Sequence, residues 1–246
     1  MKIMKIIQLS DIHLGGDYGG KFDTAKNLKS TIDYICKHES DVDMVVLTGD
    51  LCENNNEEEY MDLNMYLSKL KQSFPDIEIG AVGGNHDNFF KMKEYESTYN
   101  VFEGFTDDYG INALFLNAEN AMLSDFQLNM IRKYEPTNIF IHYPVGDIPN
   151  EFMNCEAHNL KNADAFMNVL KELPSVNVFC GHYHNAGCYE FGSISVYVAP
   201  SLQCQLDNTT KDCVVTSKIP AYSVIEFDTS YSNNVKSYTV KQVNDE

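Results

Sequence analysis

Short apolar runs alternate with segments of helical periodicity along most of the chain. Runs of four to six mostly apolar residues predict strands over 5–9, 44–47, 77–82, 111–116, 138–141 and 177–180. Apolar side chains at helical spacing predict helices over 28–36, 60–70 and 163–173, and Ser124 with Gln127 forms a capping box that begins another helix. The tail is β-rich over 194–199, 221–227 and 235–243. This alternation predicts an α/β fold built from layers of strands and helices.

The length of the chain is that of one α/β domain. It has 246 residues, 43% of them hydrophobic, which is enough to bury a sizeable core. We therefore expect a single domain over residues 1–246, without a linker or an internal repeat. The seven cysteines include no Cys-x-x-Cys pair and are odd in number. This usage predicts free thiols in a reducing compartment and no structural zinc site.

The charge of the chain limits its partners. A formal net charge of −18 makes the surface strongly acidic. Such a surface repels phosphate backbones, which argues against nucleic acid and anionic membranes. No apolar stretch approaches the roughly 20 residues that span a bilayer, and the residues after Met1 lack the apolar segment of a signal peptide. We expect a cytoplasmic protein with no membrane partner.

Five of the predicted strands end on a cluster of Asp, Asn or His side chains. In chain order the clusters are Asp11-x-His13, Gly49-Asp50, Gly84-Asn85-His86-Asp87, His142 and Gly181-His182-x-His184. Each cluster alone has a plain structural explanation, such as a turn or a hydrogen-bonded histidine. Together they hold five of the seven histidines. Because loops at the carboxyl ends of strands converge in open α/β sheets, we expect the clusters to form one site.

The donor types in these clusters predict a metal site. Imidazole, carboxylate and amide oxygen together suit manganese, iron and zinc better than calcium or magnesium. Two such ions roughly 3.5–4 Å apart can stabilise both the attacking and the leaving oxygen of a displacement at phosphorus. Asp50 is the natural bridging ligand, since a carboxylate can offer one oxygen to each ion. Glycines at 49, 84 and 181 let the backbone turn sharply beside the ligands.

The order of the motifs resembles that of the calcineurin-like metallophosphoesterases over about residues 5–200. The resemblance implies a four-layer αββα sandwich, in which two mixed β-sheets are flanked by helices. It also implies that residues 200–246 form a cap or a dimer-edge β segment, in a chain able to form a homodimer. Two metal ions are implied, manganese or iron first, with zinc as an alternative. The chain departs from the family pattern at Gly83, where proline is common, and at Tyr143, where a second histidine is common.

Carried over position by position, the resemblance implies a role for each polar residue of the clusters. The seven implied metal ligands divide into two sets that share Asp50: Asp11, His13 and His184 at one ion, and Asn85, His142 and His182 at the other. His86 would be catalytic, donating to the phosphoryl group or the leaving oxygen without binding metal. Asp87 would orient His86, as carboxylates commonly do for imidazoles. His158 would line the substrate pocket, with a purely structural role as an equal alternative.

Within this superfamily the chain most resembles the class III cyclic-nucleotide phosphodiesterases, in residues 123–128, 158–163, 180–184 and 199–201. The resemblance implies hydrolysis of a small phosphate ester, a 3′,5′-cyclic nucleotide similar to cyclic AMP, to the nucleoside monophosphate by a metal-bridging hydroxide. One alternative is a broad-specificity phosphodiester or phosphomonoester hydrolase with the same site. Another is a non-catalytic protein-binding scaffold, which the intact ligand set disfavours. A DNA exonuclease of the superfamily is disfavoured by the acidic charge.

Overall fold

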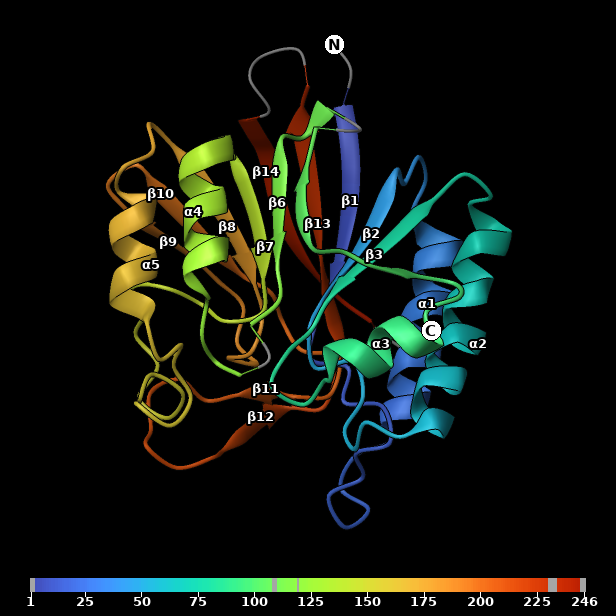
Figure 1. Ribbon diagram of the computed structural model, residues 1–246. Helices are drawn as coiled ribbons and strands as arrows, with labels where there is room; N and C mark the ends of the chain where they lie inside the picture. The colour runs from blue at the N-terminus through green and yellow to red at the C-terminus, as the bar shows by residue number, and fades with distance from the viewer. Residues whose placement is uncertain (1–2, 108–109, 119, 230–233, 244–246) are drawn as a thin grey trace.

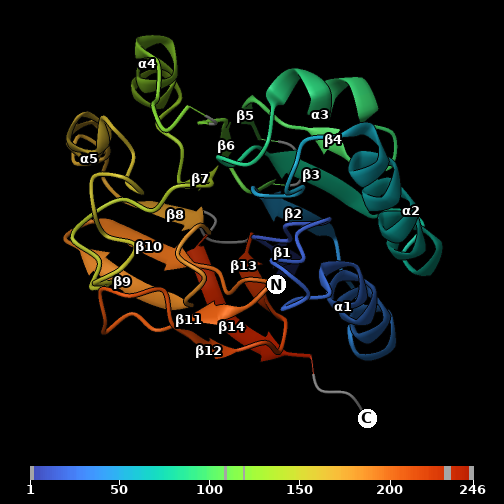
Figure 2. The ribbon, with the colours of Figure 1, turned by 90° about the horizontal axis from the view of Figure 1, so that it is seen from below.

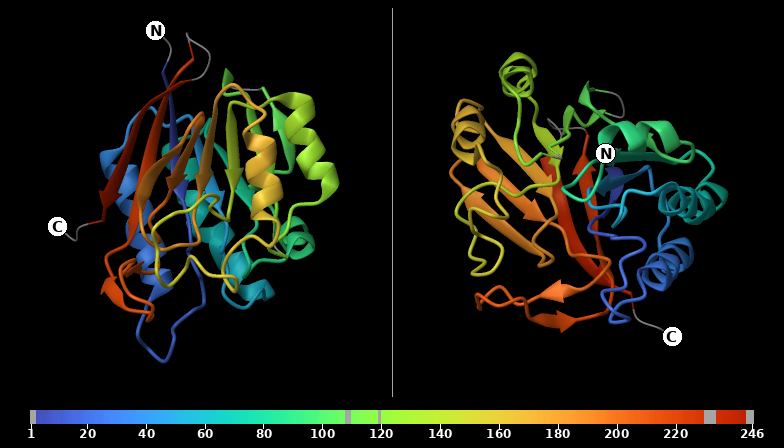
Figure 3. Two further views of the ribbon diagram at one scale, coloured as in Figure 1. Left: turned by 90° about the vertical axis from the view of Figure 1, so that its left-hand side faces the viewer. Right: turned by 60° about the horizontal axis from the view of Figure 1, so that its bottom comes forward.

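Two six-stranded β-sheets packed face to face form the centre of the molecule (Figure 1). The computed structural model describes residues 3–107, 110–118, 120–229 and 234–243. Helices cover the outer face of each sheet, so that the layers run helix, sheet, sheet, helix (Figures 1 and 3). The four-layer αββα sandwich expected from the sequence is confirmed.

The first sheet joins parallel strands from the first half of the chain to two strands from its end. Its order is β14–β13–β1–β2–β3–β4, with β1 to β4 parallel and the other two antiparallel to their neighbours. The strands are β1 (Ile3–Leu9), β2 (Met44–Thr48), β3 (Glu78–Val82), β4 (Asn100–Val101), β13 (Ala221–Asp228) and β14 (Asn234–Gln242). The helices of this side are α1 (Thr24–His38), α2 (Glu57–Ser73) and the short α3 (Phe89–Tyr95).

The second sheet has four parallel strands flanked by an antiparallel strand on each side. Its order is β5–β6–β7–β8–β10–β9. The strands are β5 (Gly104–Thr106), β6 (Ala113–Leu116), β7 (Asn138–Ile141), β8 (Val176–Cys180), β9 (Gly187–Phe191) and β10 (Ile194–Val198). Its helices are α4 (Asp125–Tyr134) and α5 (Ala163–Leu170). The predicted capping box of Ser124 and Gln127 begins α4, with both reciprocal hydrogen bonds present.

The inner strands are mostly apolar because both of their faces are largely buried. Ile7 of β1 packs towards the helices of the first sheet, whereas Ile6 beside it packs towards the second sheet. Between the sheets, the rings of Phe115, Phe140 and Phe179 stack across three neighbouring strands with centroids 5.0 Å apart at each step. This dense core gives the loops at the ends of the strands a rigid base.

The tail differs in part from the expected cap or dimer-edge segment. β13 lies inside the first sheet beside β1, so this stretch is part of the sandwich and is no cap. β14 is the edge strand of the same sheet. The short strands β11 (Gln205–Leu206) and β12 (Val215–Ser217) form a separate two-stranded sheet at one end of the sandwich (Figures 1 and 2). The place of each of these strands depends on its tertiary contacts. The alternation of apolar residues along the chain does not predict that place.

The carboxyl ends of β1, β2, β3, β7 and β8 lie at one end of the sandwich, at the bottom of Figure 1 and facing the viewer in Figure 2. The loops after these strands carry all five polar clusters, and β11 and β12 lie at the same end. The fold therefore brings the clusters to one place, as the strand order requires. None of the described helices is long and apolar enough to cross a membrane.

Candidate metal centre

The backbone at the site is held in an unusual conformation. Five of the polar residues have positive φ angles between 49° and 69°, a region that non-glycine residues rarely adopt: Asp11, His13, Asp50, His182 and His184. The loops pack so closely that a Cβ atom at Gly84 would collide with Asp50 Oδ1, and one at Gly181 would collide with Ser10 Oγ. Strain of this kind persists only where the surroundings enforce it, and it is concentrated at functional sites.

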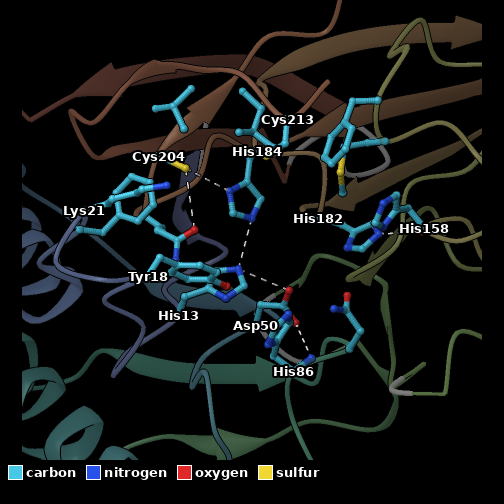
Figure 4. Close-up of a pocket in the computed structure, with 17 residues that line it drawn as sticks. His13, Tyr18, Lys21, Asp50, His86, His158, His182, His184, Cys204 and Cys213 are labelled. Atoms are coloured by element: carbon cyan, nitrogen blue, oxygen red, sulfur yellow. Dashed lines mark hydrogen bonds and ion pairs between the residues drawn. The ribbon is translucent and has the colours of Figure 1, made fainter. Parts of the chain in front are cut away.

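Asp11, His13 and His184 form the first donor set. The Nε2 atoms of His13 and His184 are 3.2 Å apart, and His184 Nε2 is 3.3 Å from Asp11 Oδ1. All three side chains are buried, and the Asp11 carboxylate also accepts a hydrogen bond from the backbone N–H of His182 at 3.0 Å. Figure 4 shows the rings of His13 and His184 pointing towards each other across the pocket.

Asp50, Asn85, His142 and His182 form the second donor set. His142 Nε2 is at its centre, 3.1 Å from His182 Nδ1, 3.1 Å from Asn85 Oδ1 and 3.3 Å from Asp50 Oδ2. The same Asp50 Oδ2 lies 3.6 Å from His13 Nε2 in the first set. The Asp50 carboxylate therefore stands between the two sets, where a bridging ligand is required.

These separations fit two metal ions. Ligands about 2.0–2.2 Å from one ion and about 90–110° apart lie roughly 2.8–3.6 Å from each other. The five distances given above within the two sets, 3.1–3.3 Å, fall in this range. Two imidazole nitrogens that face each other also need a proton or a cation between them, because two lone pairs repel. All seven ligands predicted from the sequence are thus brought together, and the chemistry of the donors matches manganese, iron or zinc.

The second ring nitrogen of each histidine in the two sets is also engaged. His13 Nδ1 is 2.7 Å from Glu53 Oε2, and His142 Nδ1 is 2.8 Å from the carbonyl oxygen of Thr48. His182 Nε2 is 2.6 Å from the carbonyl oxygen of His158, and His184 Nδ1 has the thiol of Cys204 at 3.8 Å. Such partners fix the tautomer and the orientation of metal-binding imidazoles.

The charges of the site are arranged in pairs of carboxylate and imidazole. Burial alone would raise the pKa of Asp11, but the adjacent His184 brings this pKa down to about 2. Burial would lower the pKa of His142, but Asp50 raises it to about 9. Burial, with His142 next to it, lowers the pKa of His182 to about 3. Each donor set therefore attracts positive charge, which a proton can supply when no metal ion does.

His86 lies beside Asp50, and one of its ring nitrogens comes within 4.8 Å of ligand atoms of His13 and Asp50. Its place outside the metal ligands stays a prediction. The backbone N–H of His86 donates to Asp50 Oδ1 at 2.9 Å, and its ring packs edge-on against that of His13 with centroids 4.7 Å apart. His86 Nδ1 is 3.3 Å from the carbonyl oxygen of Glu53 and 3.6 Å from its carboxylate. Contacts at Nδ1 leave Nε2 as the nitrogen available to a substrate in the pocket.

Asp87 does not orient the ring of His86, and this prediction is wrong. Its buried carboxylate accepts hydrogen bonds from the backbone N–H groups of Leu51, Cys52 and Gly84, at 2.9–3.3 Å. Burial and the nearby Asp50 raise the pKa of Asp87 to about 7. Asp87 thus ties the loop of Asp50 to the loop that carries Asn85 and acts on the backbone.

Glu53 takes the place that Asp87 was expected to fill. Its carboxylate accepts hydrogen bonds from His13 Nδ1 and from the Tyr18 hydroxyl, both at 2.7 Å, and it faces His86 Nδ1. Sequence reasoning missed both Glu53 and Tyr18. The only signal was their place on the loops that follow the first two clusters.

The two departures from the family pattern have local explanations. Tyr143 is buried and packs its ring against His142 and His182, with centroids 5.2 and 4.7 Å away. The backbone N–H of Gly83 donates to Asn117 Oδ1 at 2.7 Å, a hydrogen bond that a proline could not make. Neither departure removes a donor from the site.

The donor sets open into a pocket of about 470 Å³ (Figure 4). The pocket also contains His158, as expected, with its ring beside that of Phe152. The residues that line it outside the donor sets are Tyr18, Lys21, Phe22, His86, Phe152, Met153, His158, Gln203, Cys204, Leu206, Cys213 and Val215. Residues near β11 and β12 thus form one wall, and they lie in the stretch 200–246 that was expected to be a cap or a dimer-edge segment.

Comparison with known proteins agrees with this geometry. The model of the calcineurin-like phosphoesterase family matches residues 4–193. A Fibrobacter succinogenes protein named as a probable cyclic nucleotide phosphodiesterase is 27% identical, over 94% of this chain and 92% of its own length. An Arcobacter nitrofigilis protein named as a probable glycerophosphodiester phosphodiesterase is 28% identical, over 83% of this chain and 81% of its own length.

A solved structure shows the same fold. The purple acid phosphatase from yellow lupin seeds superposes with a TM-score of 0.60, covering 97% of this chain and 53% of the lupin chain. The two sequences are 10% identical, so this likeness concerns the fold alone.

We predict that Asp50→Asn lowers the bound metal from about two ions per chain to one or fewer. Asparagine keeps the size and tolerates the positive φ angle of 51°, but its neutral amide oxygen lacks the negative charge that lets a carboxylate bridge two cations. Metal content after reconstitution with Mn²⁺, measured by plasma mass spectrometry, checks this. Asp125→Asn, at the exposed start of α4, is the matched control and should keep both ions. Full metal content in Asp50→Asn would show that Asp50 is no bridge.

Proposed function

The chain belongs to the calcineurin-like phosphoesterase family, and from this premise we propose that it hydrolyses a 3′,5′-cyclic nucleotide to the nucleoside monophosphate. Membership makes it a metal-dependent phosphoester hydrolase. The observation that carries the proposal is that both donor sets open into one pocket whose other walls are largely aromatic and apolar. A phosphate joined to a flat organic group matches that combination.

The size and lining of the pocket support a substrate as large as a nucleotide. Its volume of about 470 Å³ lies within the range of roughly 300–1,000 Å³ that is usual for small-molecule sites. Tyr18 and Phe22 form one aromatic pair, with ring centroids 5.9 Å apart. Phe152 and His158 form another, at 5.4 Å. Aromatic side chains of this kind are suited to stacking on a nucleobase.

The relatives support the same substrate class without fixing it. The Fibrobacter protein is named for cyclic nucleotides, whereas the Arcobacter protein is named for glycerophosphodiesters. A broad-specificity phosphodiester or phosphomonoester hydrolase is therefore the second candidate. Both functions use the same centre and differ only in what the pocket walls contact.

The residues of the centre hold and polarise the phosphate group. Two bound ions, manganese or iron in first place with zinc as an alternative, would supply Lewis-acid stabilisation of the phosphoryl oxygens and lower the pKa of the attacking water. Asp50 faces both donor sets and would bridge them, while the other six ligands complete the two sets. The shell formed by Glu53, Thr48 and the His158 carbonyl keeps the imidazoles in place.

His86 is the residue we assign to the leaving group. Ribose is a poor leaving group as an alkoxide, so a proton delivered to its oxygen assists bond cleavage. His86 lines the pocket, and its Nδ1 is directed to Glu53, which leaves Nε2 to donate to that oxygen. Asp50 positions the residue by accepting its backbone N–H.

We predict that cyclic AMP is the preferred substrate with Mn²⁺ supplied. The informative comparison is kcat/KM for cyclic AMP, glycerophosphocholine and AMP, because all three esters have an alkoxide leaving group and differ in the rest of the molecule. The apolar and aromatic walls should raise kcat/KM for cyclic AMP about tenfold or more above that for glycerophosphocholine, which has no base to contact them. Activity on glycerophosphocholine should remain measurable. If glycerophosphocholine or AMP is hydrolysed more efficiently, the broad or glycerophosphodiester function replaces the proposed one.

We predict that His86→Ala keeps both metal ions but lowers kcat on cyclic AMP by about 10²–10⁴-fold. The loss on bis(p-nitrophenyl) phosphate should be much smaller, because nitrophenolate needs little protonation to leave. Steady-state rates on the two esters, with metal content measured alongside, check this. Equal losses on both esters would instead assign His86 to charge stabilisation of the phosphoryl group, and a lost ion would make it a ligand.

A further inference from the structure

Gln203 is a buried amide in the wall of the pocket. It lies between β10 and β11, and its backbone N–H is held by the carbonyl oxygen of Asp11 at 3.2 Å and by Ser201 Oγ at 2.9 Å. The residue is 4% exposed and lines the pocket. The next residue, Cys204, contacts the ligand His184, which places this stretch of the wall beside the first donor set.

The side-chain Nε2 of Gln203 is buried and has no partner at normal hydrogen-bond distance among the described residues, although the side chain faces Tyr18, whose hydroxyl donates to Glu53. The Cys204 thiol lies 3.8 Å from the Oε1 atom and donates weakly to it, so the carbonyl end of the amide is engaged and the N–H₂ end is not. Buried N–H groups are almost always paired, because an unpaired one loses its hydration and gains nothing in return. A pocket wall is the place where such a donor can be paired by a ligand.

The surroundings of Gln203 allow a ligand to reach it. Tyr18, a neighbour in the same wall, is 47% exposed and lies in a glycine-rich loop over residues 15–20. Gly19 and Gly20 both have positive φ angles, and a Cβ at either would meet no atom within 4 Å. This side of the pocket is therefore open to solvent.

We propose that Gln203 determines specificity by donating a hydrogen bond from Nε2 to the nucleoside part of the substrate. The inference rests on the proposed function and names the contact that would select its substrate. A neutral amide donor is matched by a neutral acceptor, such as a ribose oxygen or a ring nitrogen of the base. The phosphate has the metal centre as its own partner and does not need this donor. An ester without an acceptor at this place leaves the buried N–H unpaired and is rejected.

Equilibrium binding to the Mn²⁺-loaded protein tests this assignment. The variants are Gln203→Leu, which removes the donor, and Gln205→Leu, a matched change two residues away whose amide is already bonded to the Ser201 carbonyl oxygen at 2.7 Å. The probes are AMP and inorganic phosphate, with affinities measured by titration calorimetry. We expect Gln203→Leu to weaken AMP binding about tenfold or more and to change phosphate binding less than twofold. Gln205→Leu should change neither affinity.

The other outcomes separate this inference from the proposed function. AMP binding that is absent in the wild type or unchanged in Gln203→Leu overturns the specificity role. An equal loss for AMP and phosphate overturns it too, since Gln203 would then act at the metal centre. If AMP binding depends on Gln203 but cyclic AMP is not hydrolysed, the inference stands and the proposed function fails. Melting temperatures control for folding: Gln203→Leu should melt no lower than the wild type, because it removes an unpaired buried polar group.

Discussion

Two carboxylates buried at the end of the sandwich where the polar clusters meet dominate this molecule. Asp11 and Asp50 are 0% and 2% exposed, and an ionised carboxylate is costly to bury unless opposite charge and hydrogen bonds compensate it. Backbone N–H groups supply part of that compensation, and the ion pairs that the described residues make with these two carboxylates all involve histidine. Histidine is no permanent cation at neutral pH. Two metal ions would compensate the remaining negative charge of Asp11 and Asp50. The other residues of the site would hold these ions in position.

The surrounding fold supplies the rigidity that this centre needs. Strands with both faces buried hold the loop ends in fixed positions, and five of the donors then sit on backbone of positive φ. Asp87 ties two of the loops together through backbone N–H groups, and Glu53 joins His13, Tyr18 and His86. The donor sets, the His86 imidazole that we propose acts on the leaving group, and the pocket wall are therefore coupled through a few side chains. A change at Glu53 would act on all three.

The convergence of the candidate metal ligands could be predicted from the sequence because strand order determines where they lie. Five parallel strands that each end on a polar cluster leave those clusters no other place to meet, so Asp50 and His142 come together despite their distance in the chain. The partner of His86 could not be predicted, because Glu53 and Asp87 are both acidic residues near it and only the loop conformations decide between them. The role of Gln203 could not be predicted either. The sequence shows a polar residue after a strand, but it does not show whether the side-chain amide has a hydrogen-bond partner.

The central claim is that Asp11, Asp50 and their histidines form one dinuclear centre. Anomalous X-ray scattering at the manganese edge, from crystals grown with Mn²⁺, tests it directly because it locates the ions without reference to activity. The account predicts two peaks about 3.5–4 Å apart, one in each donor set and both in contact with Asp50. A single peak, or two peaks that do not share Asp50, would contradict it.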